Sequence, residues 1–444
     1  MSSIKALRNK TVWIKTAPAM LLVLNSFVWY IFTYPILSQL INGLNLVNAV
    51  KLGLFAAYFL GVTISAIIGS ILIPPKRTIS LYLWLFAGSG ATLLLFIIPT
   101  NSAPIIALFS FFIGISAGIG LPSCLSYFAH STSPENRGVI GGVIWSMVGF
   151  LVLLFAFLTS ILSQSEMIIL LAVWRFFGGA VFLFMAIKRS DFPVQKSPIY
   201  SALIRKKEVL LYLVPWIMLC LINFAEAPIL ESHFGPNFDT IQLVEWAIVG
   251  IVAVGAGIIA DTVGRKRIVL AGFVMLGIEY AILSTFYSAP ITLYLFLILD
   301  GTTWGFLFSA FFTAIWGDLA ENYEKEKYYV LGGLPYLLSN FMYVLVKPIV
   351  SDISLIAAFS FASFFLFLAV IPLMYAPETL PEKSIKEREL KSYLEKAQKF
   401  AEKETEKNNK RDVRKTKKEN EEANEETQES PEYEEARKLA EKYY

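Results

Sequence analysis

The stretch from Gly257 to Arg267 reads GIIADTVGRKR, with apolar runs on both sides. We therefore expect a short loop that joins two buried helices. Gly257 and Gly264 lack side chains, which suits close backbone approach or a positive φ angle. Asp261 falls at a helix C-terminal end, where the macrodipole disfavours an anion, so it needs a partner such as Arg265 or a neighbouring helix N-terminus. The three consecutive cations that end the stretch predict a cytoplasmic loop.

Composition predicts a membrane protein. It has 444 residues, of which 56% are hydrophobic, and this is too apolar for an ordinary soluble protein. Cys124 and Cys220 lie inside apolar runs, which argues against a disulfide framework. His130 and His233 lack ligand partners at metal spacing. We expect no metal, no cofactor, no nucleic-acid partner and no enzymatic activity.

Apolar runs long enough to span a bilayer, about 20 residues each, recur along the chain. Lys5 to Lys15 precede the first run without a cleavage pattern, which indicates a retained anchor helix. The pattern predicts an all-α membrane protein with twelve transmembrane helices, over residues 17–40, 47–73, 79–98, 104–129, 138–162, 167–187, 209–231, 241–260, 267–287, 291–318, 328–350 and 354–376.

The cations between the runs predict the orientation. One set of ends carries almost all of them, and the opposite ends have only Lys51 and Lys347. The rich set therefore faces the cytoplasm, as do both termini, and we expect the plasma membrane as the location. The rich set comprises Lys5 to Lys15, Lys76–Arg77, Arg137, Lys188–Arg189, Arg205 to Lys207, Arg265 to Arg267, Lys325 and Lys327.

The two parts of the chain repeat each other. Pro35-Ile36-Leu37 returns as Pro228-Ile229-Leu230, Lys76–Arg77 as Lys266–Arg267, and Gly141–Gly142 as Gly332–Gly333. These offsets are 193, 190 and 191 residues, which predicts a duplicated six-helix unit. The expected domains are a first six-helix half (1–187), a cytoplasmic central loop (188–208), a second six-helix half (209–380) and a charged cytoplasmic tail (381–444).

The loop at Gly257 to Arg267 resembles the G-x-x-x-D-x-x-G-R-K/R signature of the major facilitator superfamily. Pro134 to Gly138 is similar to the P-x-x-R-G pattern of the same family. The resemblance covers roughly residues 12–382 and implies secondary transport by two facing halves. It also implies a gate that closes the cytoplasmic side, with Gly257, Asp261, Gly264, Arg265, Lys266, Arg137 and Gly138 as its residues.

Other strings refine the resemblance. In the first half the aspartate position of the signature is Ile71 and the glycine position is Pro74, so a latch built on that aspartate is expected only in the second half. Trp174-Arg175 and the string from Ala376 to Leu380 resemble W-R and P-E-T strings of sugar porters. They favour that branch.

The tail from Pro381 is rich in Lys and Glu. It predicts an exposed helix over residues 386–407 and a disordered stretch from Asn408 to Pro431. A solubilising role is favoured over a partner-binding one.

Acidic residues inside apolar runs are the best candidates for function, because they are costly in hydrocarbon and mark ion or substrate paths. Asp300 leads, with Trp304 one turn further along. Glu226 is second, with Asn223 one turn before it and Pro228 shortly after. We expect Asp300 and Glu226 to carry protons and, with Asn223 and Trp304, to contact the solute.

Other polar residues in the runs allow two readings. Asn25 and Trp29 could present an amide and an aromatic wall to the solute, or serve helix packing and face lipid. Glu245 falls near a helix end and could simply be interfacial, whereas Glu279 could have a structural partner. Arg175 is expected to be structural, neutralising an acid or reaching the interface.

The sequence therefore predicts a monomeric secondary transporter that moves a small polar or weakly charged solute, sugar-like in the first instance, by proton symport. A drug/proton antiporter would also use acidic and aromatic groups, but the helix from Gly138 to Leu162 lacks the Gly-Pro pair of such antiporters. A solute receptor that signals through its tail is the alternative of another class.

Overall fold

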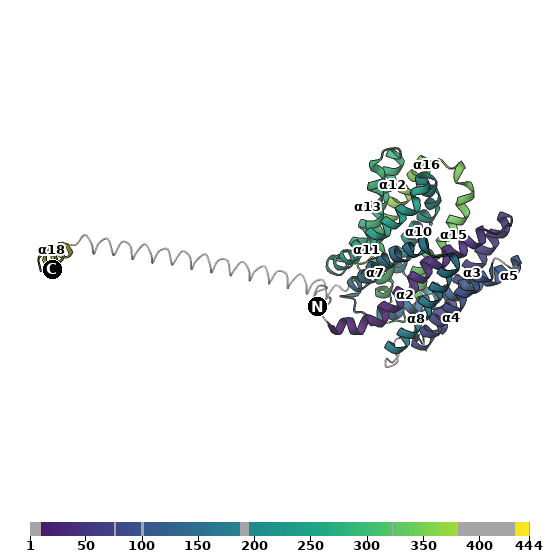
Figure 1. The fold of residues 1–444 in the computed structure, drawn as a ribbon, viewed down its shortest axis with the longest axis horizontal. Coiled ribbons are helices and arrows are strands. Elements are labelled where there is room, and N and C mark those ends of the chain that lie inside the picture. The colour runs from purple at the N-terminus through teal and green to yellow at the C-terminus, as the bar shows by residue number, and fades with distance from the viewer. Residues whose placement is uncertain are drawn as a thin grey trace. The chain divides into compact units, whose positions relative to one another are not determined.

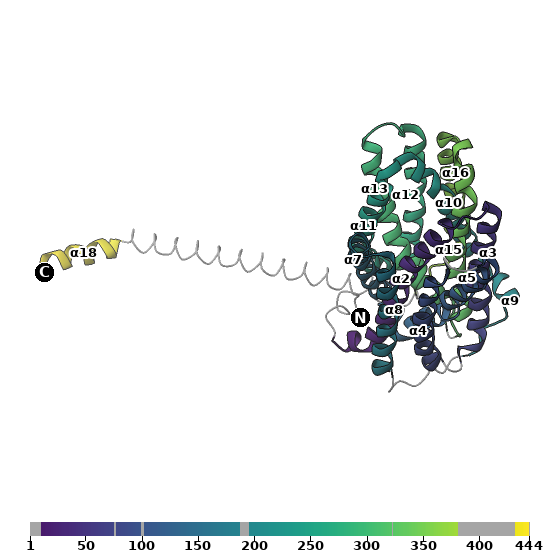
Figure 2. The same cartoon turned by 45° about the vertical axis from the view of Figure 1, so that its right-hand side comes forward.

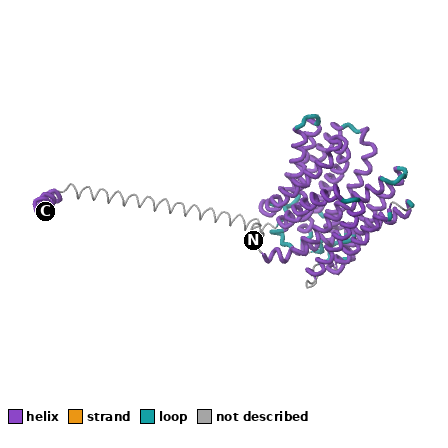
Figure 3. The backbone as a smooth tube through the Cα atoms, in the orientation of Figure 1, coloured by secondary structure: helices purple, strands orange, loops and turns teal. Residues whose placement is uncertain are grey.

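The described part of the chain is helical throughout. The computed structural model describes residues 10–74, 77–98, 102–186, 195–321, 323–380 and 431–443. Helices joined by short connections make up nearly all of this part (Figure 3), with one isolated β-bridge between Gln195 and Tyr323. The chain divides into two compact units, Met1–Pro381 and Glu382–Tyr444.

In the second unit the structure describes one helix, α18 (Pro431–Tyr443), whose side chains are exposed. Its sequence mixes acidic and basic residues, and the few apolar ones, such as Ala436, Leu439 and Ala440, recur at helical spacing. The exposed helix expected over residues 386–407 and the disordered stretch after it fall outside the described residues.

The first unit begins with seven helices that cover the first part of the sequence. A short 3-10 turn, η2 (Leu94–Phe96), extends the third of them. Their bounds are α2 (Lys10–Asn42), α3 (Asn48–Leu72), α4 (Arg77–Leu93), α5 (Ala103–Gly118), α6 (Leu121–Ser131), α7 (Arg137–Ile161) and α8 (Gln164–Ala186).

The second part of this unit begins with the short helix α9 (Tyr200–Ile204). The 3-10 turns η4 (Gly235–Asn237) and η6 (Lys347–Asp352) and the π-helix η5 (Leu307–Ile315) interrupt or extend the longer helices. Those helices are α10 (Lys207–Phe234), α11 (Phe238–Val263), α12 (Arg265–Phe286), α13 (Ile291–Phe306), α14 (Trp316–Leu319), α15 (Glu326–Val346) and α16 (Leu355–Tyr375).

Every predicted apolar run overlaps one of these helices or a series of consecutive helical segments, such as α13, η5 and α14 for the run 291–318. Among the described residues, 11 stretches are long and apolar enough to cross a membrane. One of them, Lys207–Val263, has 57 residues and comprises α10 and α11 joined by η4. The predicted number of twelve spans treats these two helices separately, and it stays a prediction.

The helices of the first unit separate by their order in the chain. In Figures 1 and 2, α2, α3, α4, α5 and α8 gather on one side, and α10 to α13 and α16 on the other. Several pairs connect the sides: α7 packs along α11 and against the π-helix, and α3 and α6 pack against α15. Both proposed halves lie within one compact unit, so the division at residues 188–208 stays a prediction.

Glycines allow the backbones of α7 and α11 to touch. A Cβ atom at Gly142 would collide with the backbone of Ala253, and one at Gly149 would collide with Gly250. Gly138 and Gly257 are in the same kind of contact at one end of the pair. Small residues that bring helices this close are a main source of packing energy in membranes.

A leucine at Gly142 is therefore expected to force α7 and α11 apart. Overpacking of this kind costs about 1–3 kcal/mol and occasionally more, so the thermal midpoint of Gly142→Leu protein in detergent should fall clearly below that of the wild type. Gly255→Leu on α11 is the matched control, because nothing lies within 4 Å of a Cβ atom there. Equal midpoints for the two variants would contradict the close contact.

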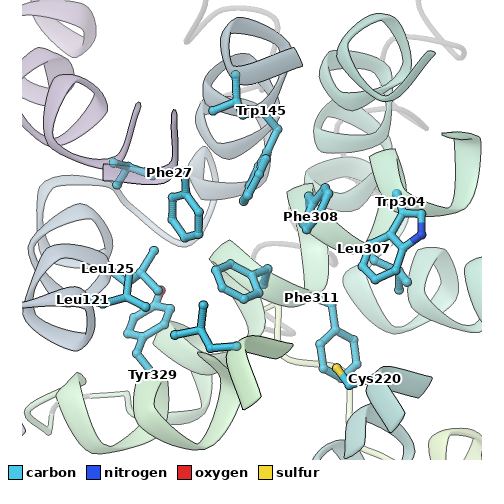
Figure 4. Close-up of a cluster of buried hydrophobic side chains, with 14 of the residues drawn as sticks. Phe27, Leu121, Leu125, Trp145, Cys220, Trp304, Leu307, Phe308, Phe311 and Tyr329 are labelled. Carbon is cyan, nitrogen blue, oxygen red and sulfur yellow. The ribbon is translucent and has the colours of Figure 1, made fainter. Parts of the chain in front are cut away.

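Aromatic side chains fill the space between the two sides at their centre (Figure 4). Trp145 of α7 stacks on Phe308 of the π-helix at 4.0 Å between ring centroids. Phe27 of α2 lies 4.9 Å from Trp145 and 5.4 Å from Phe312. We call these four residues the aromatic layer. They close the centre of the molecule in this structure.

Candidate functional site: an acidic cavity and a latch

The signature loop joins α11 to α12 as expected, and Asp261 has both partners that its position demands. Its carboxylate accepts hydrogen bonds from the backbone N–H groups of Gly138 (2.9 Å) and Val139 (2.7 Å) in the first turn of α7. It also accepts one from Arg265 Nη2 at 3.3 Å. Gly264 has φ +117°, which confirms its expected backbone role. The positive end of α7 thus neutralises an anion at the negative end of α11.

Asp318 of α14 joins this group although the sequence analysis did not single it out. One of its oxygens accepts from Arg137 Nη1, and the other pairs with Arg265 Nη1. All four charged side chains, Arg137, Asp261, Arg265 and Asp318, are at most 3% exposed. Two cations and two anions make the set neutral, which is what burial requires. We call these four residues the latch.

The counterpart loop of the first part has a different pair. Arg77, at the start of α4, donates from Nε to Glu326 Oε1 at 2.6 Å, and both side chains are buried. Glu326 begins α15, so this ion pair also joins the two sides of the unit. A latch on the family aspartate was expected only in the second part, and Asp261 forms it there. In the first part, the carboxylate of Glu326 pairs with Arg77 instead.

Glu378, and Lys266 of the gate motif, have roles that were not expected. The carboxylate of Glu378 accepts from the backbone N–H groups of Arg265 (2.9 Å) and Lys266 (3.2 Å), and so caps the N-terminus of α12. Lys266 Nζ donates to the carbonyl of Met374 at 2.7 Å. The P-E-T string, first interpreted as a sugar-porter mark, is therefore a cap that fixes the signature loop.

Lys325, in the connection before α15, gives a pH-dependent prediction. Burial lowers the pKa of Lys325 to about 7, whereas an unfolded lysine titrates near pH 10.4. Between these values the unfolded chain binds more protons, so stability rises with pH. The thermal midpoint should increase from pH 7 to pH 9 more in the wild type than in Lys325→Met protein. Lys10→Met, at an exposed position, should behave like the wild type. An identical pH response in all three would refute the prediction.

A cavity of about 170 Å³ lies among α10, α11, α13 and α15. It extends toward Leu230 and Phe238, which flank the connection between α10 and α11, at the end opposite the latch. Aromatic rings form much of its wall, and Asn223 and Gln242 add amides. We call it the acidic cavity. Its lining includes Asn223, Gln242, Glu245, Trp246, Asp300, Trp304, Phe308 and Tyr336.

Two carboxyl groups meet in the wall of this cavity. The side chains of Glu245 and Asp300 both line this wall, together with Trp304. Two carboxylates in one small cavity repel each other, which favours a proton shared between them. Glu245 thus faces the cavity, because α11 turns this side chain toward α13, where the backbone of Glu245 approaches Gly301. Its interfacial depth stays a prediction.

The other two acidic candidates lie outside the cavity wall. Glu226 is 5% exposed. The cavity face of α10 is formed by Asn223, Phe224, Ala227 and Leu230, and the middle of this face lies about 90° around the helix from Glu226. Glu279 of α12 is 1% exposed. Neither of its oxygens has a hydrogen-bond partner among the described residues.

The structure does not bring Asn25 and Trp29 to the acidic cavity. Asn25 donates from Nδ2 to the carbonyl of Trp174 at 2.7 Å and accepts from Arg175 Nη1 at 3.1 Å. Trp29 is 1% exposed and donates to Thr92 Oγ1 at 2.7 Å. Their polar atoms serve helix packing, and Trp29 does not face lipid.

Arg175 has contacts of a structural kind, but they are not the ones expected. Among the described residues, no acidic side chain pairs with it. It is fully buried, donates to Ser26 Oγ at 2.8 Å, and lies over the rings of Trp29 (4.7 Å) and Trp84 (4.2 Å). These cation–π contacts replace the missing carboxylate. Its Nε and Nη2 atoms have no hydrogen-bond partner in the described part of the chain.

Comparison with known proteins places this arrangement in a fold family. No protein-family model and no curated protein matches the chain. It is similar to the crystal structure of the human organic anion transporter MFSD10 (TETRAN), with a TM-score of 0.59 and 14% sequence identity over 82% of this chain and 100% of that one. That protein is a major facilitator superfamily transporter. The likeness shows a major facilitator fold; it does not support the sugar-porter branch.

Proposed function

We propose that the chain is a proton-coupled secondary transporter of a small organic solute. The observation that carries the proposal is the pair of carboxyl groups, Glu245 and Asp300, in the wall of the acidic cavity. A shared proton in a buried site is released only when water or a solute reaches it, and that is the property that coupling needs.

The surroundings of the pair indicate the solute. Trp246, Trp304 and Tyr336 offer flat apolar walls, and Asn223 and Gln242 offer both donors and acceptors. The solute would therefore combine an apolar ring or chain with polar groups, and carry no net charge or a weak positive one. Asn223, Asp300 and Trp304 keep the solute-binding role expected of them. Glu226 serves as a second protonatable group behind the cavity face.

Alternating access follows from the two closures in this structure. The latch and the Arg77–Glu326 pair close one end, and the aromatic layer separates the acidic cavity from that end. We propose that the latch end is cytoplasmic, because Arg77, Arg137 and Arg265 gather there. The plasma membrane, cytoplasmic termini and a monomeric state complete the proposal.

Purified protein in liposomes with a trapped pH dye tests the function. A solute that enters together with protons supports symport and identifies its class. Proton movement opposite to a lipophilic cation would establish the antiporter instead. Binding without any flux would establish a receptor, and deletion of residues 381–444 would then abolish its output. A wild type that neither binds nor moves any member of a panel of polar solutes, lipophilic cations and organic anions would defeat the proposal.

A second candidate solute class follows from Arg175. This fully buried cation has no acidic partner among the described residues, and two of its nitrogens lack acceptors. An organic anion could supply the missing charge if the cage of Trp29 and Trp84 opens, and the human protein of similar fold is an organic anion transporter. Proton-driven uptake of an aromatic carboxylate that is lost in Arg175→Gln protein, with Glu166→Gln as an exposed control, would favour this class.

A further inference from the structure

A second hollow lies away from the acidic cavity. It is an apolar groove of about 620 Å³ between α3, α9, α10 and α15. Several of its side chains are large, apolar and exposed, among them Ile67 (37% exposed), Ile204 (41%), Ile217 (37%) and Leu221 (42%). Leu334 of α15 also lines it. We call it the apolar groove.

The groove offers almost nothing to a polar solute. Its two hydroxyl groups are already engaged: Tyr200 with Ser70 Oγ at 2.6 Å, and Ser339 with the carbonyl of Pro335 at 2.6 Å. The remaining lining is hydrocarbon. A hydrocarbon chain is therefore the ligand that fills it without leaving a polar group unpaired.

The length of the groove agrees with one leaflet of a bilayer. Along α15 it extends from Val330 to Met342, and these 12 steps correspond to about 18 Å at 1.5 Å per residue. Half of the hydrocarbon core of a bilayer measures about 15 Å. One acyl chain of a phospholipid fits this dimension.

Positive charge gathers at one end of the groove. Ile204 lines it, and Arg205, Lys206 and Lys207 follow directly, Arg205 and Lys207 being exposed. Lys327 Nζ lies 5.9 Å from the ring centroid of Tyr200. Such basic clusters beside spanning helices attract anionic headgroups.

We propose that the apolar groove is a binding site for an anionic phospholipid, with an acyl chain along α10 and α15 and the phosphate group at Arg205, Lys207 and Lys327. Because α3 and α15 belong to opposite sides of the unit, the lipid fills the gap between them in the conformation that the latch holds. This site is independent of the transport proposal.

Native mass spectrometry of the full chain tests the site, with added phosphatidylglycerol or phosphatidylcholine of identical acyl chains. The wild type should retain phosphatidylglycerol at least tenfold more strongly. Arg205→Gln with Lys207→Gln should remove the preference for the anionic lipid, and Leu334→Trp should remove both lipids. Arg267→Gln at an exposed position of α12, and Ile251→Trp on α11 (69% exposed), should bind like the wild type.

Other results would overturn the proposal. Equal retention of the two lipids would remove the headgroup site. Unchanged retention in Leu334→Trp protein would show that the lipid binds elsewhere, and an equal loss in Arg267→Gln would show unspecific attraction. A dimer that disappears in Leu334→Trp protein would make a second copy of this chain the occupant.

Discussion

Asp300→Asn protein should bind its solute and exchange it across the membrane, but it should no longer accumulate that solute against a gradient. The asparagine can still hydrogen-bond to Glu245, so the cavity keeps its shape, yet it cannot take up or release a proton. In liposomes with an imposed pH gradient, we expect proton-driven uptake to fall at least tenfold while solute counterflow continues. Glu245→Gln should behave in the same way, because the two carboxyl groups share one proton.

Asp239→Asn is the matched control for this experiment. Asp239 is an exposed carboxylate in the first turn of α11, on the helix that carries Glu245. Its removal should leave both uptake and counterflow unchanged. Wild-type accumulation in both Asp300→Asn and Glu245→Gln protein would exclude the pair from proton coupling. Glu226 and Glu279 would then be the remaining candidates for the coupling group.

Asp318→Asn should have the largest effect on stability. The substitution leaves Arg137 and Arg265 buried with one carboxylate between them, and an uncompensated buried charge costs about 3–5 kcal/mol. We expect a strongly lowered thermal midpoint in detergent.

The exposed pair of Glu231 and Lys347 provides the comparison. Their charged atoms lie 3.0 Å apart, but the side chains are 36% and 52% exposed, so Glu231→Gln should cost less than about 1 kcal/mol. Equal midpoints for Asp318→Asn and Glu231→Gln would show that the latch is not a buried neutral set.

Sequence reasoning located most of the helices because the apolar runs are long and their ends carry charges or prolines. It also predicted the partners of Asp261, because a buried anion at a helix C-terminus has few physical solutions. It did not find Asp318, Glu326 or Glu378 as parts of the closed end. Each of them contacts residues more than 100 positions away, and only the packing of helices brings them together.

The positions of Glu245 and Trp29 show the same limit in another form. Depth along a helix follows from counting residues, but the direction of a side chain depends on how the helix is rotated against its neighbours. Glu245 is near a helix end and still faces Asp300, and Trp29 is central but lies under Arg175. The contact of Arg175 with two indole rings could not be predicted either, because in the sequence those tryptophans look like any other aromatic residues of an apolar run.

The π-helix gives Asp300 and Asp318 a mechanical relation. Both carboxylates belong to the continuous stretch Ile291–Leu319, and the nine residues of η5 lie between them. Each π turn holds one residue more than an α turn, so winding one such turn back into α geometry changes the rotational phase of all that follows by about 100°. Rotation of one part of this helix against the other would thus move Asp300 and Asp318 together, and would couple a change of protonation in the cavity to opening of the latch.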